Sequence, residues 1–168
     1  MSEKSVNEAV SFGERLAGSQ AFADLFRDGM TLVEETAAYL DGPGRQESKK
    51  LERNGALAYA TESMRLTTRL MQLASWLLLH RAVKEGEMSL AQANKEKAKV
   101  KLSVGEHSDE HNIKLLPERL CVLIQRSKVL QSAVRRLDAT IHAVPTRVER
   151  SNPVERQLGL LKAAFEHE

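Results

Sequence analysis

The segment from Thr61 to Val83, TESMRLTTRLMQLASWLLLHRAV, constrains the fold more than any other part of the chain. Placed on a helical wheel at about 100° per residue, its apolar side chains cover roughly half of the circumference. Because so wide a stripe can contact two helices, this helix should either form the centre of a bundle or serve both a bundle and a dimer partner. One flank consists of Leu66, Leu70, Leu73 and Leu77, and the other of Met64, Met71, Ala74 and Leu78.

The opposite arc of the same helix is polar and holds the single tryptophan of the chain. Arg65, Arg69, Gln72 and His80 occupy this arc, and Trp76 lies in its middle. An exposed tryptophan forgoes about 2–3 kcal/mol of burial, and Trp and Arg are the residues enriched at binding hot spots. We therefore expect Arg65, Arg69 and Trp76 to form a docking surface, unless a loop or a terminal arm of the same chain covers Trp76.

A first helix is predicted from Ser19, a good N-cap residue, to Leu40. One of its faces is apolar and the other is acidic. The sequence Asp-Gly-Pro-Gly over residues 41–44 predicts a firm stop, and a polar loop is expected over residues 44–50. The apolar face consists of Phe22, Leu25, Phe26, Val33, Ala37 and Leu40.

The apolar segment described first belongs to a second, long helix, predicted from about Glu52 to Glu85 and ended by a glycine. Ser89 and Gln92 then have the spacing of a capping box. They predict a shorter helix over residues 90–100, which is weakly apolar and is expected to lie on the surface.

A loop is expected over residues 103–112, and Pro117 begins another helix that runs to about His142. We therefore predict an all-α fold, an antiparallel three-helix bundle with a short extra helix, over residues 19–144. Residues 1–18 are predicted to form a flexible arm. The last long helix has an apolar seam with the heptad spacing of near-parallel helix packing, made of Leu120, Leu123, Ser127, Leu130, Val134, Leu137 and Ile141.

Residues 145–168 are predicted to form a flexible tail that contains a short amphipathic helix, because Asn152 and Pro153 suit a cap and a first turn. One face of this helix carries Leu158, Leu161 and Phe165. We expect these three side chains to form a second docking surface that folds on contact with a partner. The alternative is that the tail packs back on its own bundle.

The sequence contains no pattern that indicates catalysis or a cofactor. Phosphate-binding and nucleophile-elbow glycine motifs are absent, and Cys121 has apolar neighbours and no nearby base. His107 and His111 are four residues apart, but their context reads as a polar loop and lacks the Glu of a metalloprotease helix. We therefore predict a protein that is not an enzyme and that binds neither a metal nor a cofactor.

The formal net charge of +2 is too mild to imply nucleic acid. A basic face on the last long helix, with Lys128, Arg135 and Arg136, leaves a DNA-associated helical regulator as the alternative function, although Asp138 dilutes that face. A single cysteine fits a reducing cytoplasm. No run of about 18 apolar residues exists, so we expect a cytoplasmic protein without a membrane anchor.

Two long strings of residues resemble the RcdA family, the regulators of CtrA degradation in alphaproteobacteria. The first is GMTLVEETAAYLDG, residues 29–42, continuing to Arg45. The second is LAYATESMRLTTRLMQLASW, residues 57–76, continuing to the Gly-Glu-Met at residues 86–88. The resemblance covers about residues 19–90, and the last long helix fits more loosely.

The resemblance implies a three-helix bundle that forms a homodimer and has no catalytic activity. It implies an adaptor of the ClpXP protease in cell-cycle control, which joins a ClpX primed by a CpdR-type response regulator. The adaptor then tethers cargo transcription regulators of the CtrA type, directly or through a PopA-type cyclic-di-GMP effector. A role of the tail in these contacts, a transient location at the cell pole and no direct contact with nucleic acid are expected with it.

Overall fold

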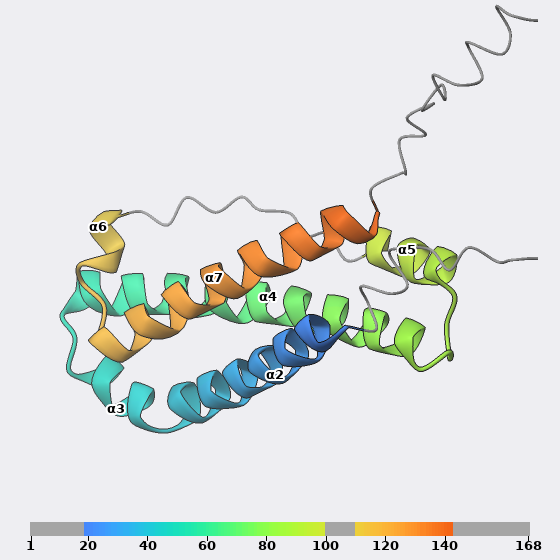
Figure 1. Ribbon diagram of the computed structural model, residues 1–168. Helices are drawn as coiled ribbons and strands as arrows, with labels where there is room; N and C mark the ends of the chain where they lie inside the picture. Colours follow the sequence, from blue (N-terminus) through green and yellow to red (C-terminus); the bar gives the residue numbers. More distant parts are fainter. Residues whose placement is uncertain (1–18, 100–109, 143–168) are drawn as a thin grey trace, which may run out of the picture.

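The computed structural model describes residues 19–99 and 110–142, which form six helices and no strand (Figure 1). The predicted all-α fold is therefore confirmed. Three long helices, α2, α4 and α7, each pack against the other two. The helices are α2 (Gln20–Asp41), α3 (Pro43–Lys49), α4 (Arg53–Lys84), α5 (Leu90–Lys99), α6 (Glu110–Ile113) and α7 (Glu118–Ile141).

The first two long helices run antiparallel, as predicted. Phe22, at the start of α2, packs against Trp76, which lies late in α4. Gly44, just after α2, lies against Tyr59, which is early in α4. The chain therefore reverses its direction between them.

The third long helix, α7, runs in the same direction as α4 (Figure 1). Gly55, early in α4, lies against the backbone of Leu115, just before α7. Further along both helices, Arg69 donates a hydrogen bond to Ser127. The prediction of a bundle that is antiparallel throughout is therefore wrong for this pair. The physical reason is that α6, which directly precedes α7, packs at the beginning of α4, whereas α5 packs at its other end.

The predicted caps set the helix boundaries. Ser19 caps α2 by accepting a hydrogen bond from the backbone N–H of Phe22 at 3.3 Å. The capping box of α5 is also present, with the Gln92 N–H donating to Ser89 Oγ at 3.1 Å and the Ser89 N–H donating to Gln92 Oε1 at 3.0 Å. Gly86 follows α4 with a φ of 75°, a conformation that glycine adopts without strain.

The loop expected over residues 44–50 is instead the short helix α3. Pro43 stands in its first turn, where a missing N–H costs nothing and the fixed φ favours a helix. Glu47 in α3 accepts a hydrogen bond of 2.6 Å from the Tyr39 hydroxyl of α2, and this bond secures the corner. The loop predicted over 103–112 likewise ends in the single turn of α6.

The buried face of α2 is rotated from the predicted one. The buried residues of α2 are Phe22, Gly29, Leu32, Thr36 and Tyr39, whereas Ala37 of the predicted face is exposed. A Cβ atom on Gly29 would lie 2.5 Å from Cδ1 of Leu77, so glycine lets α2 approach α4 closely here. Four predicted side chains still pack partly buried against the core, namely Leu25, Phe26, Val33 and Leu40.

The heptad seam of α7 faces the core, as predicted, with all of its residues buried except the half-buried Leu137. The first flank of α4, from Leu66 to Leu77, is buried against it. No helix in the described ranges has the length and apolarity needed to cross a membrane. The predicted arm over residues 1–18 and tail over residues 145–168 lie outside the described residues.

The replacement Gly29→Ala tests the close approach of α2 to α4. Overpacking against the buried Leu77 should lower the free energy of unfolding by about 1–3 kcal/mol. The higher helix propensity of alanine should raise it by only about 1 kcal/mol, so we expect a net loss of stability. Urea denaturation followed by circular dichroism measures this change. In the background of Leu77→Ala the same replacement should cost less, and a net stabilisation in the wild-type background would contradict the packing.

Candidate functional site

The predicted docking arc of α4 is not exposed. Trp76 and Arg69 are each only 1% exposed, so the expectation that they lie on a polar surface is wrong. Within the described residues, helices α2 and α7 cover the tryptophan. Phe22 of α2 lies 6.2 Å from the indole, between ring centroids, and the Asp138 carboxylate of α7 accepts the indole N–H.

Arg69 instead joins α4 to α7. Its guanidinium donates a hydrogen bond of 2.8 Å to the Ser127 hydroxyl, which in turn donates to the backbone carbonyl of Ile124. This pairing explains why a serine interrupts the apolar seam of α7. Arg65 is the predicted docking residue that keeps a partly exposed side chain, and it pairs with the buried carboxylate of Glu62 at 2.7 Å.

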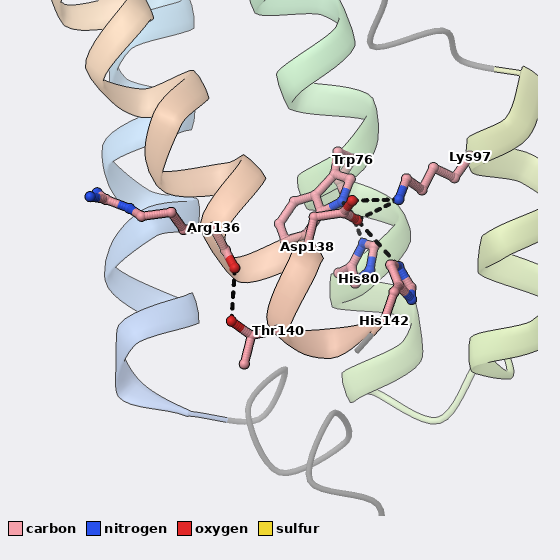
Figure 2. A network of polar contacts seen from close by, with 7 residues as sticks. All are labelled: Trp76, His80, Lys97, Arg136, Asp138, Thr140 and His142. Atoms are coloured by element: carbon pink, nitrogen blue, oxygen red, sulfur yellow. Dashed lines mark hydrogen bonds and ion pairs between the residues drawn. The ribbon is translucent and has the colours of Figure 1, made fainter. Parts of the chain in front are cut away.

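A network of polar side chains surrounds Trp76 (Figure 2). The indole N–H donates to Asp138 Oδ1 at 2.8 Å. Lys97 of α5 donates to both oxygens of the same carboxylate, at 2.6 and 2.5 Å. His142 places its Nε2 atom 3.2 Å from Asp138 Oδ1, and the His80 ring stacks on the indole with 4.0 Å between centroids.

The surroundings of this network decide which groups carry charge. Burial raises the pKa of Asp138, but the hydrogen bonds from Lys97 and Trp76 outweigh it, so the pKa is lowered overall and the carboxylate is ionised. Burial is the main cause that lowers the pKa of His80. It also lowers the pKa of His142, despite the nearby Asp138. At neutral pH the network therefore joins one carboxylate, one ammonium and two neutral imidazoles.

Sequence reasoning did not bring these residues together, because His80, Lys97 and Asp138 are far apart along the chain. One signal was available, since Asp138 and His142 are four residues apart and lie on the same face of a helix. The spaced pair His107 and His111, at which no metal site was expected, is not tested, because only His111 lies within the described residues.

A separate feature lies on the outside of α4. Its second apolar flank, predicted for either the bundle or a dimer partner, is exposed on the described chain at three of its four residues, and Ala74 is half-buried. Met64 is 71% exposed and Met71 is 66% exposed. Three nearby hydroxyls, those of Ser63, Thr67 and Ser75, donate to backbone carbonyls of the preceding turn. We name this surface the α4 stripe; its four members recur every seven residues, and they are Leu57, Met64, Met71 and Leu78.

The α4 stripe has the spacing that a helix uses to pack alongside another helix. Four apolar side chains at intervals of seven form one row along just over two-thirds of a 32-residue helix. A row of large exposed apolar residues is typical of an interaction surface rather than of a solvated one. The predicted tail surface, formed by Leu158, Leu161 and Phe165, lies outside the described residues.

Comparisons with known proteins agree with the resemblance seen in the sequence. Residues 13–165 match the family model described as "Protein of unknown function (DUF1465)". The structure is similar to the crystal structure of RcdA from Caulobacter crescentus CB15, with 51% sequence identity, a TM-score of 0.62 and coverage of 78% of this chain and 98% of that chain. Among curated proteins, no sequence matches the chain.

Replacement of Trp76 by phenylalanine tests its role inside the bundle. The change removes the hydrogen bond to Asp138 and part of the buried ring, so we expect a loss of about 1–3 kcal/mol in the free energy of unfolding. Chemical denaturation followed at 222 nm measures this loss. Glu34→Ala, at an exposed position of α2, is the control and should change stability by less than about 0.5 kcal/mol; equal effects of the two replacements would contradict the assignment.

Proposed function

The chain belongs to the RcdA-type family that the DUF1465 model describes, and from that membership we propose that it is a non-enzymatic adaptor for regulated proteolysis. The adaptor brings cargo transcription regulators of the CtrA type to the ClpXP protease. The observation that carries this proposal is the 51% identity to RcdA over 98% of that chain. At that level of identity, surfaces as well as the fold are expected to be shared.

The physical demands on an adaptor are compatible with the described surface. An adaptor acts by raising the local concentration of cargo at the protease, to around millimolar for a short flexible linker. It therefore needs exposed contact surfaces rather than a catalytic pocket. The α4 stripe supplies one such surface, because Met64 and Met71 project from the rigid helix at its centre.

We assign the α4 stripe to homodimer formation. A seven-residue repeat on one helix is self-complementary, because the same row on a second copy can pack against it along its length. Val122 and Val129 form a shorter exposed row with the same spacing on α7. The buried flank of α4 serves the bundle and the exposed flank serves the second copy, which is one of the two arrangements expected from the width of the apolar stripe.

The remaining contacts are assigned to other partners. ClpX primed by a CpdR-type regulator and a PopA-type cyclic-di-GMP effector are the partners expected of the family. Leu158, Leu161 and Phe165 in the tail are proposed to bind a partner, with the partly exposed Arg65 as a contact on the bundle. Trp76 and Arg69 are proposed to support these surfaces from inside the bundle, because both side chains are buried.

A reconstituted degradation assay tests the adaptor function. Purified ClpXP, a CpdR-type regulator and a CtrA-type cargo are combined with and without this protein, with a PopA-type effector and cyclic-di-GMP present in both reactions. We expect faster loss of cargo while this protein itself survives. Leu158→Ala with Leu161→Ala should reduce the acceleration if the tail docks a partner.

The same assay has a built-in control and a clear negative outcome. Omitting the CpdR-type regulator should abolish the acceleration, because ClpX is then not primed. If no cargo is degraded faster in the complete mixture, the adaptor proposal is wrong for this chain. Duplex DNA binding over a salt series would then test the DNA-associated alternative, for which affinity falls steeply as salt rises.

The variant Met71→Glu tests the homodimer. A carboxylate in the middle of an apolar helix–helix interface is desolvated without a partner, so we expect the wild type to be a dimer and the variant to be a monomer by light scattering coupled to gel filtration. Ala37→Glu, which adds the same charge at an exposed position of α2, is the matched control and should remain a dimer. A monomeric wild type, or a dimeric Met71→Glu variant, would refute this use of the stripe.

A further inference from the structure

The polar network around Trp76 contains a set of side chains suited to a metal ion. One nitrogen from each of His80 and His142 and one carboxylate oxygen of Asp138 lie within 4.8 Å of one another. His80 comes from α4, while Asp138 and His142 come from the last turn of α7 and its end (Figure 2). Two imidazole nitrogens and a carboxylate oxygen form a common set of protein ligands for zinc.

His80 is held in the orientation of a ligand. Its Nδ1 atom lies 3.0 Å from the backbone carbonyl of Trp76, and because a carbonyl can only accept, Nδ1 carries the ring proton. The Nε2 atom therefore presents a lone pair. This ring is 0% exposed, and within the described residues Nε2 has no hydrogen-bond partner.

A buried nitrogen without a partner normally destabilises a protein, so its presence calls for an explanation. Metal-binding histidines typically donate their second ring N–H to a backbone carbonyl or a carboxylate, which orients the ring and fixes the tautomer. His80 has this arrangement with Trp76. Asp138 is oriented in the same way, by the hydrogen bond from the Trp76 indole.

A cation already occupies the position beside the carboxylate. The Lys97 ammonium lies 2.6 and 2.5 Å from the two Asp138 oxygens. Lys97 comes from α5, and its side chain is 26% exposed. A flexible side chain at the edge of the protein can turn outward into water and leave the carboxylate to a different cation.

We propose that His80, Asp138 and His142 form a zinc site, which Zn²⁺ enters by displacing the ammonium of Lys97. The ion takes the lone pair of His80 Nε2, one imidazole nitrogen of His142 whose proton resides on the other nitrogen, and one oxygen of Asp138. Water completes four-coordination. In this arrangement Lys97 acts as an internal competitor of the metal, and the Lys97–Asp138 ion pair between α5 and α7 is broken when the ion binds.

Competition with Lys97 provides a test. If the cluster only stabilises the fold, removal of Lys97 will not strengthen Zn²⁺ binding. Zn²⁺ is titrated into the full-length protein against a chromophoric chelator, and Co²⁺ is used in parallel because its visible absorption reports tetrahedral coordination. We expect one ion per chain in the wild type. Lys97→Met should bind Zn²⁺ about tenfold more tightly, because no charge-assisted hydrogen bond has to be displaced. His142→Gln should bind at least about tenfold more weakly.

The choice of variants separates loss of the site from loss of the fold. Lys97 and His142 are partly exposed, and circular dichroism will establish that both variants fold. His111→Gln, outside the cluster, is the matched control and should bind as the wild type does. Saturation with Zn²⁺ should also change the fluorescence of Trp76 in the wild type and in Lys97→Met. Equal affinity of Lys97→Met and wild type, unchanged affinity in His142→Gln, or no binding at all would overturn the proposal.

Discussion

The hydrogen bond from the Trp76 indole to the Asp138 carboxylate is the interaction on which the rest of this structure depends. It joins α4 to α7, while the indole ring packs against Phe22 of α2. The same carboxylate holds Lys97, so α5 is attached through it as well. Because an ionised carboxylate in a partly buried position requires partners to remain charged, removing one member of this group weakens the contacts of the other helices.

The parallel direction of α4 and α7 determines what the bundle exposes. Successive turns of these two helices meet in the same order, as the pairs Arg69–Ser127 and Trp76–Asp138 show. Their shared interface and α2 together cover one side of α4. Its other side receives no long helix among the described residues, and an apolar row at seven-residue intervals remains exposed there. The topology therefore accounts both for the buried polar network and for the exposed stripe of the same helix.

Local patterns allowed the three long helices and α5, the caps at Ser19 and Ser89 and the seam of α7 to be predicted, because each depends on neighbours within one or two turns. The direction of α7 and the burial of Trp76 could not be predicted in this way. A helical wheel places a residue on an arc, but it does not say whether another helix will cover that arc. The burial of Arg69 could not be predicted for the same reason, since its partner Ser127 is 58 residues away and looks like an interruption of an apolar seam.

Because α4 has these two different faces, mutations can separate effects on stability from effects on assembly. A change at Trp76 or Arg69 acts on the bundle from inside, so any loss of partner binding would accompany a loss of stability. A change at Met64 or Met71 removes exposed area without touching the core, so it can alter assembly while the fold persists. The polar arc, which the sequence predicts to be a docking surface, therefore joins α4 to α7 inside the bundle. The methionine flank, which the sequence offered to either the bundle or a dimer partner, is exposed on the described residues.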